Sequence, residues 1–174
     1  NHGSLDLVYC PPVSVNYDFT RNKTEAGVVQ PGTLIIGGNT GSVFVGTNAT
    51  TSGVAVGSRS GNTNVLGYGV DIVGSNSTAN AFGQVGFNTS VLGGSATGNI
   101  MVETKEDGLQ MTGGSQNDSY AMVGHGGNGG SANYTGMIRG DTRHGAVDGD
   151  VTMTSGAGGS TYTQIGHGGD SVDG

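Results

Sequence analysis

The chain is poor in charge, proline and tryptophan, and each shortage excludes a class of protein. Only 11% of its 174 residues are charged, against about a quarter in ordinary soluble domains. Three prolines among 37 glycines exclude collagen, which needs glycine at every third position and abundant proline. Because only 33% of the residues are hydrophobic, we expect a slender core rather than a bulky globular one.

Positive charge is scarce as well. Six Lys and Arg residues stand against 13 Asp and Glu, so the net charge is −7 and no basic stripe is available for a phosphate backbone. We therefore expect no nucleic-acid binding and no attraction to anionic lipid. No apolar run approaches the roughly 20 residues that cross a bilayer, so we expect no membrane span.

Cys10 is the single cysteine. It excludes an internal disulfide framework and a four-cysteine metal site. The role of this thiol stays open between burial and intermolecular pairing. Lipidation is disfavoured, because the bulky Tyr9 precedes the cysteine and the basic and apolar regions of a lipoprotein signal are missing.

The chain instead has a composition typical of β-structure, with short apolar segments separated by turn residues. Val, Ile and Thr recur between Gly, Asn and Ser turns, and no window keeps a helical period, so we expect an all-β fold with no significant helix. Residues 1–32 are expected to be an irregular N-terminal leader, and residues 33–174 a series of repeats. Strands of three to five residues are predicted at 43–46, 54–57, 71–74, 84–86 and 91–93.

The clearest regularity is a repeat with an offset of 42 residues. Residues 108–128 match residues 150–170 without gaps, and eight of about twenty positions are identical, including the run Gly-His-Gly-Gly. A fainter third copy begins at Val70. In it Phe82 precedes an apolar-glycine pair by the same spacing as the tyrosine of the other two copies does, and the alignment is then one residue out of register. A fixed period with small drifts is typical of stacked repeats, in which each unit contacts only its neighbours.

These repeats predict a parallel β-helix, or β-solenoid. With a rung of about 20 residues, the 42-residue unit equals two rungs, and the repeats make about seven. Val, Ile, Leu and Met are expected to face inward, and Thr, Gln, Ser and Asn outward. Both ends would be open sheet edges, so we expect either a piece of something longer or copies stacked end to end.

The runs Val-Gly-His-Gly-Gly at 123–127 and Ile-Gly-His-Gly-Gly at 165–169 resemble repeats of very large bacterial haemagglutinin-type and autotransporter-like surface proteins. The resemblance covers residues 98–174 best. It implies a right-handed β-helix, secretion across the outer membrane, and a role in adhesion, biofilm or fibre formation. Residues 52–60 are also similar to the head repeats of trimeric autotransporter adhesins, whose shorter period this chain does not hold.

Two histidines in equivalent glycine turns suggest a metal site. Two rungs apart they would lie about 9.6 Å from each other, whereas two ligands of one zinc lie within about 4 Å. A 42-residue rung would bring them to about 4.8 Å and reopen the question. We interpret both runs as structural repeat turns, formed by Gly124, His125, Gly126, Gly127, Gly166, His167, Gly168 and Gly169.

Four aspartates resemble pieces of calcium-binding glycine-aspartate loops, in which carboxylates and carbonyls supply six to eight oxygens. They are Asp148, Asp150, Asp170 and Asp173. The nonapeptide pattern of such loops is not satisfied and not repeated in tandem. We therefore prefer ordinary turn aspartates and keep calcium as a weak candidate, with no other cofactor expected.

Enzymes with a β-helix cleave polysaccharides with paired carboxylates in a groove. Here only Glu103, Glu106 and Asp107 cluster, beside Lys105, and a solvated loop explains them. The chain has no tryptophan to stack on a sugar, no phosphate-binding loop and no nucleophile elbow. We therefore expect no enzymatic activity.

Together these observations predict a structural and adhesive protein outside the cell or on the bacterial surface, a subunit or segment of a fibre or adhesin. Its expected partners are further copies in an oligomer or filament, and a glycan or protein on a host or cell surface. The alternatives are a calcium- or glycan-binding β-solenoid module and a β-helical polysaccharide-degrading enzyme. A candidate donor strand, which would complete the open edge of a neighbouring copy, contains Val13, Val15, Tyr17 and Phe19.

Overall fold

The computed structural model describes residues 42–46, 53–89, 94–131, 133–141, 143–144, 147–170 and 172–173, and the backbone pairing of five earlier strands. The described residues are all-β with almost no helix, as the composition predicted. No helix among them is long and apolar enough to cross a membrane. In chain order the strands are β1 (Leu5–Val8), β2 (Val15–Asp18), β3 (Thr24–Glu25), β4 (Val28–Val29), β5 (Leu34–Gly37), β6 (Val43–Gly46), β7 (Val54–Gly57), β8 (Thr63–Val73), β9 (Gly83–Val85), β10 (Ile100–Thr112), β11 (Ala121–Val123), β12 (Gly130–Ser131), β13 (Ile138–Asp141), β14 (Arg143–His144), β15 (Val147–Asp148), β16 (Val151–Thr154), β17 (Thr163–Ile165) and β18 (Val172–Asp173).

Two parallel sheets contain most of these strands. The first has the order β1-β6-β8-β10-β13, with β16 also paired to β10 and β5 also paired to β8. The second has the order β17-β11-β9-β7-β2. Short antiparallel pairs are formed by β14 with β15 and by β3 with β4. Neighbouring strands in both large sheets are far apart in the chain, as parallel pairing requires.

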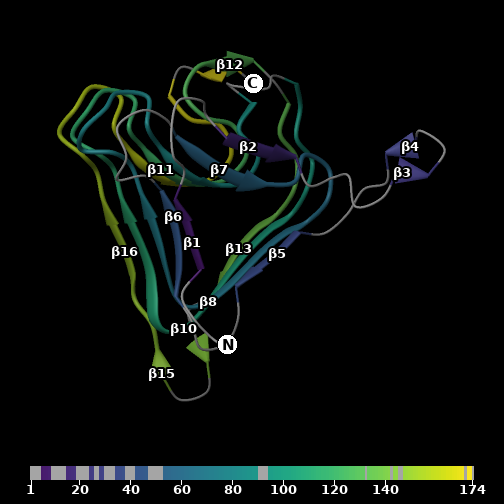
Figure 1. Cartoon of the computed structure of the whole chain (residues 1–174), viewed down its shortest axis with the longest axis horizontal. Coiled ribbons are helices and arrows are strands. Elements are labelled where there is room, and N and C mark those ends of the chain that lie inside the picture. Colours follow the sequence, from purple (N-terminus) through teal and green to yellow (C-terminus); the bar gives the residue numbers. More distant parts are fainter. Residues whose placement is uncertain are drawn as a thin grey trace.

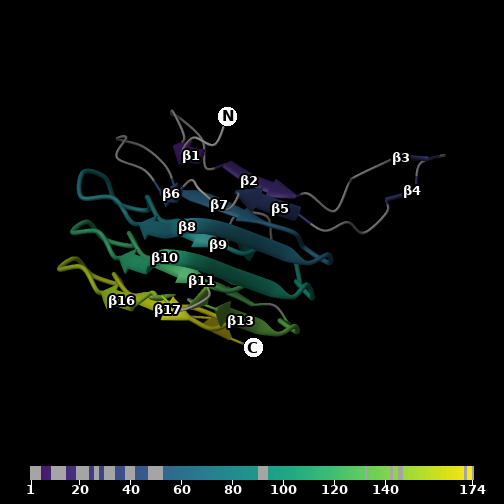
Figure 2. The same ribbon diagram turned by 90° about the horizontal axis from the view of Figure 1, so that it is seen from below.

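Successive segments of the chain follow the same outline, each stacked on the one before it. We call each such segment a layer and define five layers by their strands. Layer 1 contains β1 and β2, layer 2 contains β5 to β7, layer 3 contains β8 and β9, layer 4 contains β10 and β11, and layer 5 contains β13, β16 and β17. Viewed along the stack, the layers overlie one another with a three-sided outline (Figure 1). From the side they follow one another from the N-terminal to the C-terminal end (Figure 2).

One repeat forms one layer, so the expectation of two rungs of about 20 residues in each 42-residue unit is wrong. Leu109 pairs directly with Val151, and hydrogen bonds join Asn62 with Asn99 and His125 with His167, which lie 37 and 42 residues apart in the chain. The reason is that each of these layers has three sides, and the connections between its strands take more residues than the strands. The strands from residue 34 onward therefore form four layers instead of seven.

The predicted strands at 43–46 and 54–57 are confirmed as β6 and β7, and those at 71–74 and 84–86 overlap β8 and β9. Residues 91–93 lie outside the described residues. β8 and β10 span 11 and 13 residues, beyond the expected three to five, because each runs on through a corner of the layer. At that corner the register between them shifts between Thr104 and Gly108.

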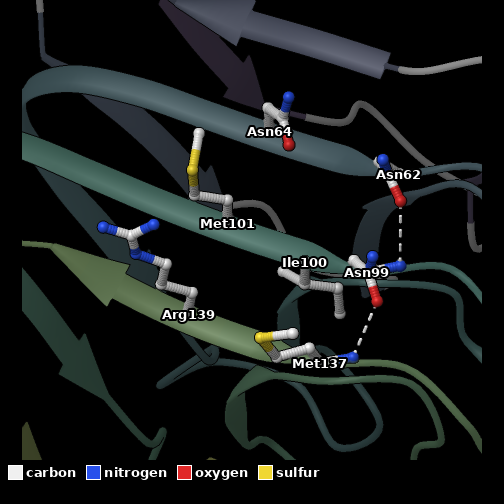
Figure 3. A pocket seen from close by; sticks show the side chains of 7 residues that line it. All are labelled: Asn62, Asn64, Asn99, Ile100, Met101, Met137 and Arg139. Atoms are coloured by element: carbon white, nitrogen blue, oxygen red, sulfur yellow. Dashed lines mark hydrogen bonds between the residues drawn. The ribbon is translucent and has the colours of Figure 1, made fainter.

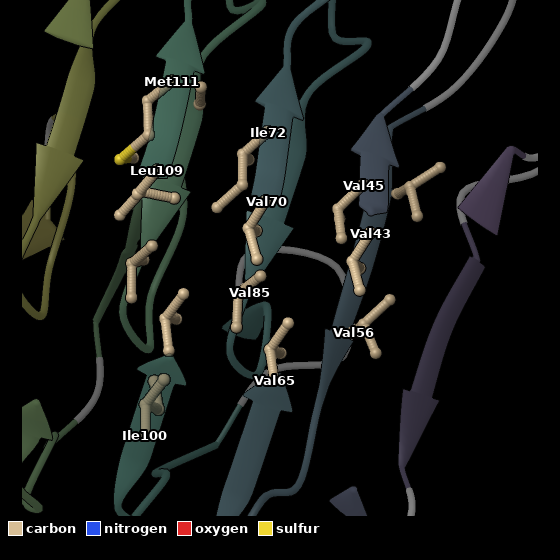
Figure 4. Packing of buried hydrophobic residues seen from close by; sticks show 14 residues of the cluster. Val43, Val45, Val56, Val65, Val70, Ile72, Val85, Ile100, Leu109 and Met111 are labelled. Carbon is tan, nitrogen blue, oxygen red and sulfur yellow. The ribbon is translucent and has the colours of Figure 1, made fainter. Parts of the chain in front are cut away.

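The core lies between the two sheets and is filled mainly by valine and isoleucine side chains, together with Leu109 and Met111 (Figure 4). In β8 burial alternates along the strand except at Gly69 and Val70, which are both buried, as expected for a half-buried strand that turns a corner. Val43, Val70 and Leu109 occupy one register position in successive layers, and all three are buried. The same is true of Val45, Ile72 and Met111 at the next inward position.

The second sheet departs from the expected alternation, because β9 and β11 are buried on both faces. Gln84 was expected to face outward and is fully buried. Its outer neighbours are a second apolar cluster that contains Ala55, Phe82, Tyr120 and Met122. The prediction failed here because alternation alone cannot show that a connection of the same layer covers the outer face.

Two strands of the N-terminal leader, β1 and β2, belong to the same two large sheets, whereas β3 and β4 pair only with each other. β1 pairs with β6, and β2 pairs with β7, so that Val15 and Tyr17 register with Val54 and Val56. Val13, Phe19 and Cys10 lie outside the described residues. Since β2 pairs with β7 through one edge, addition to a neighbouring copy would use its other edge, and the donor role stays a prediction.

Candidate functional site

Aromatic rings form a column along the stacking direction. Phe82, Tyr120 and Tyr162 occupy the same position in layers 3, 4 and 5. Their ring centroids are 4.7 and 4.8 Å apart, and consecutive planes differ by only 3°. The spacing equals the distance between strands in a sheet, so ring contact and backbone pairing support each other.

A second column contains the two histidines. The rings of His125 and His167 are stacked with centroids 5.0 Å apart and planes within 3°. Phe87 precedes them in layer 3, and the guanidinium carbon of Arg59 lies 4.5 Å from the centroid of its ring. Tyr134 flanks His167, with the ring centroids 6.5 Å apart.

Hydrogen bonds fix the state of each imidazole. The Phe87 N–H donates to Nδ1 of His125 at 3.0 Å, and the His125 N–H donates to Nδ1 of His167 at 3.1 Å. Because a backbone N–H can only donate, both Nδ1 atoms are unprotonated. Nε2 of His125 therefore carries the proton and donates to the Gly98 carbonyl at 2.7 Å. Nε2 of His167 faces the Gly136 carbonyl at 3.3 Å.

The same geometry shows whether His125 and His167 could bind one metal ion, a question that a 42-residue layer reopens. The two rings are indeed adjacent, but both nitrogens of each ring are engaged with backbone groups. His125 is fully buried, and burial lowers its pKa from 6.5 against the effect of the Gly98 hydrogen bond. Within the described part of the chain no group of three or more His, Cys, Asp and Glu side chains could hold a metal ion.

The glycines of the two runs allow the layers to approach. A Cβ added to Gly124 would lie 1.9 Å from the Gly166 carbonyl oxygen, and one added to Gly126 would lie 2.0 Å from that of Gly168. Gly126 also has a φ of 131°, which side chains rarely allow. At Gly124 and Gly126, therefore, only glycine fits against the backbone of layer 5, whereas a Cβ on Gly168 would meet nothing within 4 Å.

Sequence reasoning missed a buried polar network beside the aromatic column. Asn88 donates from Nδ2 to the Gln84 Oε1 atom at 2.9 Å and to the Tyr120 hydroxyl at 2.8 Å. The Gln84 Nε2 atom donates to the Gly124 carbonyl at 2.9 Å. The network joins layers 3 and 4 and satisfies polar groups that would otherwise be costly to bury. No spacing in the sequence indicated it.

The four candidate calcium ligands are not brought together. Asp148 is opposite Arg143 in the backbone register of the β14–β15 hairpin, and the Asp150 backbone carbonyl accepts a hydrogen bond from the Leu109 N–H. Asp170 accepts a hydrogen bond from the Ser160 hydroxyl at 2.7 Å, and Asp173 registers with Ser131. β15 lies at the bottom of the view in Figure 1, whereas β12, which pairs with β18, lies at the top.

The clustered carboxylates lie on the outer side of the first sheet. Glu106 and Asp107 are exposed at the register shift of β10, and Glu106 accepts a hydrogen bond from the Tyr68 hydroxyl. Sequence reasoning overlooked Asp71, whose pKa is raised by burial and then by the charge of Asp107. Glu103 is half-buried further along β10.

A small surface pocket of roughly 200 Å³ opens beside β8, β10 and β13 (Figure 3). Ligand pockets usually measure about 300 Å³ or more. Its asparagines connect layers, because the Asn99 N–H donates to Oδ1 of Asn62 and the Met137 N–H donates to Oδ1 of Asn99. The remaining lining residues are Asn64, Ile100, Met101 and Arg139.

The described residues thus present repeated columns that hold layers together, rather than one concave site with converging reactive groups. Comparison of the chain with models of protein families, with curated proteins and with solved structures found no match.

Proposed function

We propose that the chain is a structural and adhesive β-solenoid, a subunit or segment of an extracellular fibre or adhesin on a bacterial surface. The observation that carries the proposal is the layer repeat, in which the same backbone position recurs one sheet spacing further along. Such a structure grows in length by adding layers, each of which contacts only its neighbours. Length without bulk is what a surface fibre needs.

The interior of the stack supports this role. Hydrogen bonds, aromatic columns and glycine positions all join one layer to the next. The low charge and the Asn-, Ser- and Thr-rich exterior suit a β surface outside the cell, where the resemblance to haemagglutinin-type repeats also points. The four aspartates lie apart, and no specific observation favours the calcium-binding or enzymatic alternatives.

The proposal is tested by displaying the chain on the outer surface of a non-adhesive bacterium. We expect the displaying cells to aggregate with one another or to adhere to host-cell surfaces, and soluble glycans to reveal whether a sugar is the receptor. The matched control is Gly124→Leu, which places a large side chain where a Cβ alone would lie 1.9 Å from the Gly166 oxygen. If the wild-type chain is folded at the cell surface but mediates no more adhesion than the Gly124→Leu control, the adhesive role is contradicted.

A further inference from the structure

Layer 5 exposes apolar side chains at positions that are buried in the layer before it. Val151, Met153 and Ile165 are 50%, 43% and 45% exposed. Their partners in layer 4, Leu109, Met111 and Val123, are 3%, 1% and 2% exposed.

The backbone of the same layer is open to pairing. Between layers 4 and 5 the Leu109 N–H donates to the Asp150 carbonyl, and the Ala121 N–H donates to the Tyr162 carbonyl. In a parallel ladder alternate residues direct their groups to opposite sides. The N–H groups of Val151 and Thr163, at the equivalent positions in layer 5, therefore point away from layer 4, toward a further layer.

The other end of the stack presents the matching edge. Leu5 registers with Val43, at the position that Val151 occupies in layer 5. Leu7 registers with Val45, at the position of Met153. In the second sheet Tyr17 occupies the position of Ile165. Apolar residues therefore stand at the same register positions on both edges.

We propose that the layer 5 edge binds the layer 1 edge of a second copy of this chain, head to tail. β16 of one copy pairs in parallel with β1 of the next, and β17 pairs with β2, so both sheets continue without a change of register. The contact joins two different surfaces of the same molecule, and such heterologous contacts build open filaments. This assembly rests on the proposed fibre function and names its partner.

A second copy fits better than an unrelated partner because one chain carries both edges. They face opposite ends of the stack, run in the same strand direction and carry apolar residues at the same positions (Figure 2). In such a contact the strands of both sheets pair at once, whereas an unrelated strand would pair with a single strand of one edge.

Charge placed in the contact tests the proposal. Sedimentation of the wild-type chain is expected to show oligomers that grow with concentration. Met153→Lys weakens this association at least about tenfold, because the ammonium would be buried without a partner. Thr152→Lys is the matched control on the adjacent outward position, and it associates as the wild type does. Circular dichroism and the urea midpoint verify that both variants fold. Equal association of Met153→Lys and wild type overturns the interface, as does a wild-type chain that stays monomeric.

Cross-linking tests the register independently. Asp6 registers with Phe44, at the position of Thr152. In a Cys10→Ser background, Asp6→Cys protein mixed with Thr152→Cys protein forms a disulfide dimer, and neither protein forms one alone. The out-of-register pair Asp6→Cys with Thr154→Cys forms none. Disulfide dimers from either protein alone contradict a head-to-tail contact. A folded monomer that still mediates adhesion would overturn this interface and leave the proposed function standing.

Discussion

The imidazole of His125 lies flat against that of His167, 5.0 Å away, and its own backbone N–H donates to the Nδ1 atom of His167. One residue thus contacts its repeat partner through both ring and backbone. Because Nδ1 of His125 accepts a hydrogen bond in the same way from Phe87, only the neutral imidazole fits this position.

The first prediction concerns pH. Burial holds the pKa of His125 below 6.5 in the folded chain. Above pH 7 the imidazole is neutral in both states and its contribution to stability is complete. As the pH falls through 6.5 the unfolded chain takes up the proton first, and stability declines until the pH reaches the folded pKa. Urea unfolding at pH 7.5 and pH 5 measures this loss.

His125→Gln is the matched variant, because the amide can accept from Phe87 and donate to Gly98 without titrating. We expect the difference in unfolding free energy between the two pH values to be smaller in this variant. A difference as large as in the wild type would show that other groups cause the pH dependence.

The second prediction concerns close approach between layers. Gly124→Ala places a Cβ 1.9 Å from the Gly166 carbonyl oxygen, so the layers must separate there. We expect a loss of about 1–3 kcal/mol in the free energy of unfolding. Gly140→Ala is the control, because its Cβ meets nothing within 4 Å. Similar losses in both variants would argue against the glycine column.

The third prediction concerns the buried polar network. Asn88→Ala removes a hydrogen bond to the buried Tyr120 hydroxyl and one to Gln84, and should cost about 1–3 kcal/mol. Tyr120→Phe removes the other partner of the first bond. In a double-mutant cycle the two changes should cost less together than the sum of their separate costs. Additive losses would mean that the contact contributes nothing.

The fourth prediction compares two valines in one column. Val70 is fully buried, whereas Val151 is 50% exposed in layer 5. We expect Val70→Ala to cost about 2 kcal/mol, and Val151→Ala less than half as much at concentrations where copies do not associate. Equal costs in chemical denaturation would contradict the assignment of Val151 to an open layer.

The sequence predicted the strand residues and the alignment of repeats well. The match of Phe82 with Tyr120, one residue out of register, is confirmed by their stacked rings. The inward positions of Val70, Ile72 and Met111 also followed from alternation. These features depend on the local alternation of apolar and polar residues, which can be recognised in a single sequence.

The size of a layer could not be predicted in the same way. A 42-residue offset fits one long layer or two short ones, because short apolar segments show where strands lie but not which strands are neighbours. Gln84 and Asn88 were missed for a related reason. They are polar residues in a glycine-rich stretch. They are buried only because other parts of the chain pack over them, which the local sequence does not show.

The measurement that tests the account most directly is a disulfide between Gln110 and Thr152, two exposed residues that pair across layers 4 and 5. In the Cys10→Ser background the double variant Gln110→Cys and Thr152→Cys is oxidised mildly, and free thiols are counted by mass spectrometry. Adjacent layers place the Cα atoms about 4.8 Å apart, within disulfide reach, so we predict no free thiol in the monomer. If each repeat formed two rungs, the distance would be about 9.6 Å and both thiols would stay free, which would contradict the account.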